Sequence, residues 1–317
     1  MRVAFTENVE HKKKIREVEK MGATIDNALI TQFSDTVHLK AQQIKARLRP
    51  YVSVIPMKGD NFAYDGLGTV EAREIVGRIQ PVQFTDIEHL RRKIARRRFE
   101  VTIPIDSADV RGMLSDPTNR YATAIVAGIE RRFDRLCVEA MFSDVLTGRD
   151  FDTRITAVQD GVKTVDATSG LTYEKLLEIK QNFIDADVGN DMPEKFFLGI
   201  TGDEHTDLMS ETKLISGDYS RSYVIDKGEI QNALGFDIIK YAGKAAKPML
   251  DVNSSNVRSC FAASTRGIVV GISLTPKLDV SERKDYYETH QVQMIVEMGA
   301  VRTEGCLIQK VTTTASA

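Results

Sequence analysis

At 317 residues, the chain is long enough for one large domain or two ordinary ones, each with its own hydrophobic core. Its formal net charge of −2 excludes a protein that is built as a whole to bind polyanions. Cys137, Cys260 and Cys306 are too few and too scattered for a disulfide framework or a zinc site of paired cysteines, so we expect a reducing compartment.

No apolar segment of a secretory signal occurs in the first 20 residues, and the longest uncharged run, Gly267–Pro276, is too short to cross a bilayer. We therefore expect a soluble, intracellular protein without membrane contact. The charge is unevenly distributed, because residues 1–100 carry a balance of +6 and residues 101–317 a balance of −8. These two parts could attract each other, within one chain or between copies.

The first predicted elements are a helix and a short strand. Apolar residues in 26–48 recur at broadly helical spacing, which predicts a helix. Pro50 and Pro56 then bracket an apolar strand at 51–55.

Residues 57–100 are interpreted as a two-legged arm that leaves the globule. The segment 59–68 is rich in turn formers, and 69–86 is predicted to be extended, with Pro81 confining it to a sheet edge or bulge. An arm with so little apolar surface is marginal alone and needs another body to lie on.

The return leg of this arm is strongly basic. Six of the eight residues from Arg91 to Arg98 are basic, and the alternation from Phe99 to Asp106 predicts a half-buried strand. Because both faces of the basic part carry charge, we expect neither face to lie in a core.

Residues 115–148 form the strongest predicted helix. Asp116 can cap it, Pro117 suits its first position, and Gly148 is expected to end it. We expect Cys137 to be a core thiol on its apolar stripe, which also includes Tyr121, Ile125, Ile129, Phe133, Leu136, Met141 and Val145.

The remainder mixes helices and strands. Helices are predicted at 171–186 and 203–210, a strand at 194–201, further elements at 228–243 and 259–274, and two or three strands in 285–311, separated at Gly299 and Gly305. These elements interleave without a βαβ rhythm, so the fold class is α+β.

One group of residues could carry chemistry. Asp203, Glu204, His205 and Asp207 follow a predicted buried strand, where carboxylates and an imidazole could hold a metal or serve as acid and base. The alternative, which we favour, is that these acids stabilise the positive end of a helix, because no second ligand cluster exists. We accordingly expect no enzyme, with no catalytic residue, cofactor or metal.

The basic run has three interpretations. It could bind phosphates without sequence choice, contact an acidic surface of another copy, or be a solvated face. We favour contact between subunits because the run lies on an arm in a chain whose remainder is acidic. The residues concerned are Arg91, Arg92, Lys93, Arg96, Arg97 and Arg98.

The order of these parts resembles the major capsid proteins of tailed bacteriophages. Residues 105–148 look like the spine helix and its lead-in, with an Arg-x-x-Asp centre from Arg131 to Asp134. The Gly-Phe turn in 228–243 is similar to the family's turn before a strand of its axial domain, and 285–311 resembles the C-terminal strands.

This resemblance implies the Hong Kong 97-type capsid fold and a division of the chain. The implied parts are an N-terminal arm (1–56), an extended two-stranded loop across a neighbouring subunit (57–104), a peripheral domain (105–160) with spine helix 117–147, an axial domain (161–275), and a return to the peripheral domain (276–317).

The resemblance also implies a function. Copies would form the hexamers and pentamers of an icosahedral head around double-stranded DNA, after synthesis in the cytoplasm of a host bacterium. The expected partners are a separate scaffolding protein, a portal, a decoration protein and non-specifically bound DNA, with no membrane. About fifty residues precede the loop, too few for a large built-in scaffold.

Three alternatives remain open. An encapsulin-like compartment would share the fold. A metal-dependent hydrolase would centre on Asp203, Glu204, His205 and Asp207. A non-specific DNA-binding protein would use Arg91–Arg98.

Overall fold

A computed structural model describes residues 42–74, 84–105, 118–190, 194–211, 229–243, 248–283 and 289–315. The chain divides into two compact units. Unit 1 contains residues 1–44, 100–128 and 277–294, and unit 2 contains residues 45–99, 129–276 and 295–317. Unit 1 holds buried apolar residues of its own, including Ile105, Ile125, Val292 and Met294. The mixture of helices and several sheets confirms the predicted α+β class.

The long predicted helix is α3, Thr118–Phe142. Its predicted apolar stripe is buried from Ile125 to Met141, and Cys137 is a core thiol as expected. The predicted spine helix runs to residue 147, but α3 ends five residues earlier, at Phe142. Residues Val145–Thr147 form strand β5, which pairs with β6, Thr153–Ile155. Gly148 does not end the helix. It follows β5 with φ +95°, a conformation that favours glycine.

Unit 2 contains a six-stranded sheet in the order β7-β14-β11-β8-β10-β9. Every residue of β8 is buried, and Phe196 on β8 stacks 5.0 Å from Phe183 and 5.7 Å from Phe236 between ring centroids. The strands are β7 (Lys163–Ala167), β14 (Ile308–Thr314), β11 (Val257–Ser264), β8 (Phe196–Ile200), β10 (Phe236–Lys240) and β9 (Asn232–Ala233).

Two helices accompany this sheet where the sequence predicts them. Helix α4, Tyr173–Asp185, is capped by Thr172, whose side chain accepts a hydrogen bond from the Lys175 N–H. Helix α5, Gly202–Ser210, follows β8 directly. Gly235, at φ +83°, lies in the turn that leads into β10 at Phe236.

The C-terminal strands take part in two different sheets. Strand β13, Thr289–Arg302, pairs in a four-stranded sheet with the order β1-β12-β13-β4. Strand β14 instead lies between β7 and β11, with Val311 opposite both Val165 and Cys260. Residues 276–317 therefore contribute strands to two sheets, and the buried apolar side chains of β14, Ile308 and Val311, belong to the core of the six-stranded sheet.

The predicted break at Gly299 is wrong, and β13 runs through it. A Cβ at this position would lie 2.3 Å from the Ala95 carbonyl oxygen, so glycine permits a close approach here and does not end the strand. The predicted break at Gly305 is confirmed by the short 3₁₀ helix Gly305–Leu307. The other strands of this sheet are β1 (Ser53–Pro56), β12 (Ile268–Arg283) and β4 (Arg97–Ile105).

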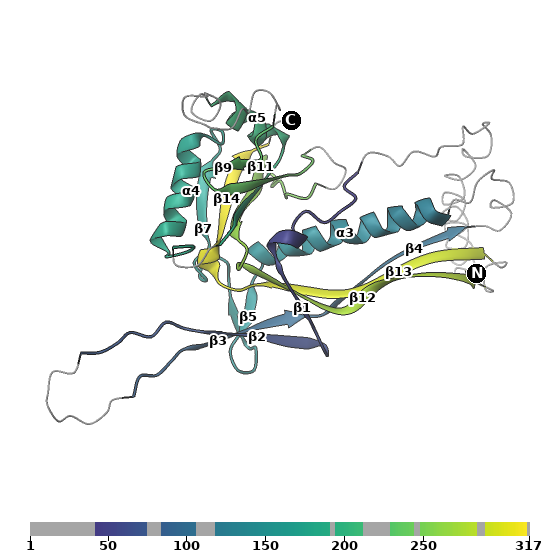
Figure 1. The fold of residues 1–317 in the computed structure, drawn as a ribbon, viewed down its shortest axis with the longest axis horizontal. Coiled ribbons are helices and arrows are strands. Elements are labelled where there is room, and N and C mark those ends of the chain that lie inside the picture. Colours follow the sequence, from purple (N-terminus) through teal and green to yellow (C-terminus); the bar gives the residue numbers. More distant parts are fainter. Residues whose placement is uncertain are drawn as a thin grey trace, which may run out of the picture. The chain divides into compact units, whose positions relative to one another are not determined.

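The arm begins as a hairpin of β2, Asn61–Leu67, and β3, His89–Ala95. Segment 59–68, expected to be turns, is therefore mostly strand. Beyond the hairpin the Gly68 N–H donates to the Glu88 carbonyl oxygen at 2.8 Å, so the two legs remain paired (Figure 1). Strands β5 and β6 extend the hairpin into a sheet of order β2-β3-β5-β6.

The helix predicted at 26–48 is not helical over its described part, residues 42–48. The N–H groups that a helix would use bind carboxylates of α3 instead. Ala46 donates to Glu130 at 3.0 Å, while Arg47 and Leu48 donate to Asp134 at 2.9 and 3.1 Å. Residues 26–41 and the cap at Asp116–Pro117 lie outside the described residues.

Candidate functional site

The basic run is divided between two sheets. Strand β3 ends at Ala95 and β4 begins at Arg97, while the Arg96 N–H between them donates to the Asp60 carbonyl oxygen at 3.0 Å. The run therefore joins the arm to the sheet that contains β13, and residues 92–98 are the base of the arm.

The sequence predicts that neither face of the basic strand lies in a core, but the side chain of Arg92 on β3 is buried. Its side chain is 5% exposed, and its guanidinium binds both oxygens of Asp160 at 2.6 and 2.7 Å. Asp160 also accepts from the fully buried Arg302 at 2.5 Å. Burial alone would raise the pKa of the Asp160 carboxyl, but the hydrogen bonds and charges of Arg92 and Arg302 lower it below its ordinary value.

This buried group joins elements that are distant in sequence. Arg302 donates to the carbonyl oxygens of Ser143, after α3, and of Ile155 on β6, and Arg92 donates to the Arg302 carbonyl oxygen at 3.4 Å. Arg92 thus fixes the base of the arm to the body of unit 2, and it is not available to another copy.

The other arginines of the run form exposed ion pairs within the chain. Arg91 pairs with Asp65 at 2.7 Å, and Arg96 pairs with Asp60 and with Glu297. Exposed pairs of this kind contribute little stability and are readily exchanged for other partners. Lys93 lies over the ring of Phe151, 5.9 Å from its centroid.

Arg97 and Arg98 reach carboxylates that already have a partner. Arg97 lies 3.4 Å from Glu139, which Arg132 binds at 2.9 Å. Arg98 lies 3.9 Å from Glu297, which Arg96 binds at 3.0 Å.

A cavity of about 650 Å³ opens beside Arg97 in unit 2. Its apolar lining includes Leu136 and Ala140 on α3 and Val301 on β13. Its charged lining is balanced, with three basic side chains, Lys93, Arg97 and Lys310, and three acidic ones, Glu139, Asp144 and Asp251. Ala95, at the end of the arm's return strand, also borders it.

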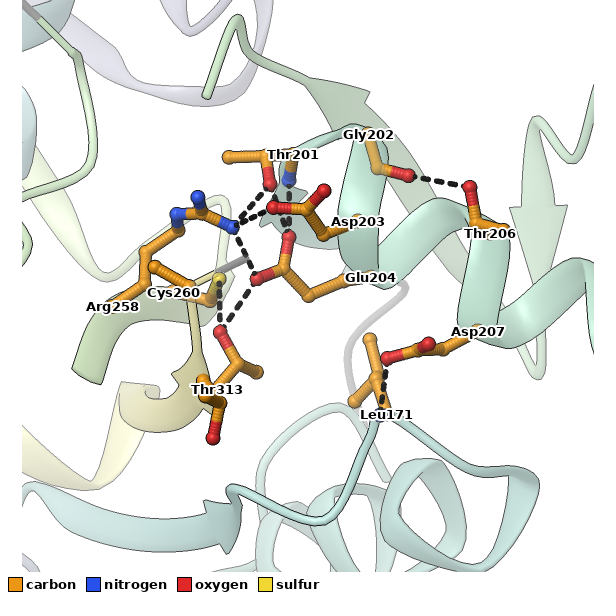
Figure 2. A network of polar contacts seen from close by, with 12 residues as sticks. Leu171, Thr201, Gly202, Asp203, Glu204, Thr206, Asp207, Arg258, Cys260 and Thr313 are labelled. Atoms are coloured by element: carbon orange, nitrogen blue, oxygen red, sulfur yellow. Dashed lines mark hydrogen bonds and ion pairs between the residues drawn. The ribbon is translucent and has the colours of Figure 1, made fainter. Parts of the chain in front are cut away.

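The acidic group after β8 is a structural network (Figure 2). Glu204 is 1% exposed and accepts from the Thr201 N–H and Thr201 hydroxyl at 2.9 and 2.5 Å, which is the arrangement of a capping box. It also accepts from the Thr313 hydroxyl at 2.6 Å and from Arg258 at 2.9 Å. Burial alone would raise the pKa of Glu204, but hydrogen bonds from Thr201, Thr313 and Arg258 lower it.

The remaining members of this group have separate partners. Asp203 binds Arg258 at 3.0 Å, and Asp207 turns away to accept from the Leu171 N–H at 3.2 Å (Figure 2). His205 accepts from the Ile230 N–H at 3.3 Å, and burial together with the charge of Lys240 lowers its pKa. The capping box at the start of α5 agrees with the helix-capping interpretation. The contacts of Glu204 with Arg258 and Thr313 also tie α5 to β11 and β14, which the sequence did not predict.

Asp160, Arg258 and Arg302 were not singled out from the sequence. No sequence motif marks these residues, and only the folded chain shows that their side chains are buried. Within the described ranges, no group of three or more His, Cys, Asp or Glu side chains is placed to hold a metal ion. Of the helices described, none is long and apolar enough to cross a membrane.

The sequence matches the family described as "Phage capsid protein" over residues 25–312. No curated protein is similar enough to match.

Solved capsid structures share the fold. The capsid of cyanophage P-SCSP1u has a TM-score of 0.68 and 11% identity over 91% of this chain and 94% of its own. The capsid of cyanophage Pam1 has a TM-score of 0.66 and 12% identity, and the match covers 90% of this chain and 97% of that chain. A structure of Gordonia phage Cozz has a TM-score of 0.64 and 14% identity, and the match covers 93% of this chain and 94% of that chain.

Proposed function

The chain belongs to the family of phage capsid proteins and is a major capsid protein of an icosahedral head, and from this premise we propose how its copies hold one another. The arm formed by residues 57–100 lies on a neighbouring copy, and the exposed arginines at its base, Arg97 and Arg98 above all, contact acidic side chains of that neighbour. Contacts of this heterologous kind close only through the symmetry of the shell.

The observation that carries this proposal is the exposure of the arm. Leu67 is 69% exposed and Phe84 is 93% exposed, although large apolar side chains gain free energy when they are buried. An arm that cannot bury these residues on itself gains stability by lying on a second body.

We also propose the division of the chain that the family resemblance implies, with one amendment. Residues 1–56 are the N-terminal arm, 57–104 the extended loop, 105–160 the peripheral domain with its spine helix, and 161–275 the axial domain. Because β14 pairs with β7 and β11, the axial domain also takes Ile308–Thr314.

The further partners are part of the same proposal. A separate scaffolding protein, a portal and a decoration protein act with the shell, which encloses double-stranded DNA through non-specific contacts, and the chain is made in the cytoplasm of a host bacterium. The structural role implies no catalysis. DNA affinity that falls steeply with salt would support the proposed non-specific contact.

The test is electron microscopy of the purified full-length chain, alone and co-expressed with a neighbouring scaffold-like gene. We expect closed shells or isolated hexamers and pentamers in at least one condition. Co-purification of an enzyme cargo instead of phage partners would favour an encapsulin-like compartment. Monomers only, in both conditions, would overturn the proposal.

A further inference from the structure

The base of the arm carries more positive than negative charge. Four arginines, Arg96, Arg97, Arg98 and Arg132, share the three carboxylates of Asp60, Glu139 and Glu297. The side chains of Arg97 and Arg98 are 57% and 66% exposed. The cavity lining itself is balanced in charge, so the surplus lies with the exposed Arg97 and Arg98 at its border. Exposed cations beside a partly apolar cavity favour an anionic partner that also carries an apolar group.

The outer part of the arm, defined as residues 67–74 and 84–88, has the complementary chemistry. It carries one arginine, Arg73, and four exposed carboxylates, none of which forms an ion pair with another described residue. These are Glu71, Glu74, Asp86 and Glu88. Four exposed apolar side chains lie among them, namely Leu67, Val70, Phe84 and Ile87.

The outer arm of a chain cannot reach the base of the same arm. Strand β3 takes six residue steps from Ala95 to His89, which at roughly 3.3 Å each is about 20 Å. The outer arm continues beyond that end, with Gly68 still bonded to Glu88 (Figure 1). Folding back would break the β2–β3 pairing, so an outer arm that meets this base must belong to another chain.

We propose that the outer arm of one copy docks on the arm base of a second copy. The carboxylates of the outer arm meet Arg97 and Arg98, and Phe84 enters the cavity of about 650 Å³ that Arg97 and Ala95 border. This inference rests on the proposed function. It names the outer arm of a neighbouring copy as the surface that the basic run contacts, in place of the acidic residues 101–317.

Charge exchange tests the electrostatic half of the proposal in the full-length chain. One variant carries Arg97→Glu and Arg98→Glu, a second carries Glu71→Lys, Glu74→Lys, Asp86→Lys and Glu88→Lys, and a third combines both sets. Like charges placed opposite each other are strongly unfavourable, so each single set should lower the assembled fraction in sedimentation by about tenfold or more. The combined variant should restore assembly.

Cysteine trapping tests the contact itself and does not need closed shells. Chains with Phe84→Cys and chains with Ala95→Cys, both with Cys306→Ser, are mixed under mild oxidation. A disulfide-linked dimer should form between the two chain types. The matched control replaces Ala95→Cys by Ser169→Cys, at an exposed position away from the cavity, and should give no dimer above background.

The outcomes separate the two proposals. Absence of any assembly by the unaltered chain would contradict the proposed function. Normal assembly of the unaltered chain, without rescue in the combined variant and without the Phe84–Ala95 dimer, would overturn this inference alone. Circular dichroism of each variant shows whether a loss of assembly comes from misfolding.

Discussion

Asp160 is the single carboxylate between two buried arginines. Its oxygens neutralise part of the charge of Arg92 and Arg302, and the Nε of Arg92 is buried without a hydrogen-bond partner among the described groups. Removing one member of a buried ion pair leaves the other member uncompensated in a medium of low dielectric. The stability of unit 2 therefore depends strongly on this residue.

We predict that Asp160→Asn lowers the free energy of unfolding by about 3–5 kcal/mol, because two buried guanidinium groups would lose their counter-charge. Urea unfolding of the unassembled chain measures it. The control is Asp65→Asn, which removes the exposed pair with Arg91 and should remain close to the unaltered chain. Equal effects of the two substitutions would contradict the importance of burial.

Glu204 predicts a pH dependence. Its pKa is lower in the folded chain than in an unfolded one, so its contribution to stability is complete above the unfolded pKa and is lost as the pH falls through the folded pKa. We expect the melting temperature to fall as the pH drops below about 4. Glu204→Gln should melt lower at neutral pH and show a shallower fall. A parallel fall in both chains would contradict this assignment.

At the scale of elements, local signals identified helices α3, α4 and α5 and the buried strand β8, but they wrongly predicted a helix that includes residues 42–48. Thr172 caps α4, Thr201 precedes α5, and both helices follow the predicted bounds within two residues. Strand β5 was missed because Val145 continues the apolar period of α3, and only pairing with β3 and β6 determines its conformation. The burial of Arg92 was missed because its partner Asp160 is 68 residues away in sequence.

Gly299 provides a test of the close approach between β13 and the end of β3. We predict that Gly299→Ala destabilises the chain by about 1–3 kcal/mol or more, because the added Cβ would overlap the Ala95 carbonyl oxygen, which is part of the backbone. Gly202→Ala is the matched control, since a Cβ there meets nothing within 4 Å. Thermal unfolding should separate the two variants, and similar melting temperatures would contradict the predicted overlap.

At the scale of the whole molecule, the surface charges of the arm matter more to assembly than to folding. The pairs of Arg91, Arg97 and Arg98 are exposed, so salt screens them with little effect on the single chain. Contacts between copies that depend on the same arginines should be weakened by the same screening.

We predict that raising NaCl from 0.05 to about 1 M lowers the assembled fraction while the melting temperature of the unassembled chain changes little, because the Debye length falls from above 10 Å to about 3 Å. Light scattering during assembly measures the first quantity. Sucrose at matched osmolality is the control. Assembly that is insensitive to salt would indicate that apolar contacts dominate.

The place of β14 in its sheet has a consequence for biosynthesis. This strand fills the position between β7 and β11, so Gln309 pairs with Lys163 and with Ala262, residues that leave the ribosome much earlier. Contacts so distant in sequence form slowly, and the sheet cannot close during translation until residues 308–314 have emerged. A prematurely terminated chain would lack the strand that joins β7 to the rest of the sheet, so an unfinished polypeptide would be excluded from the shell by its own failure to fold.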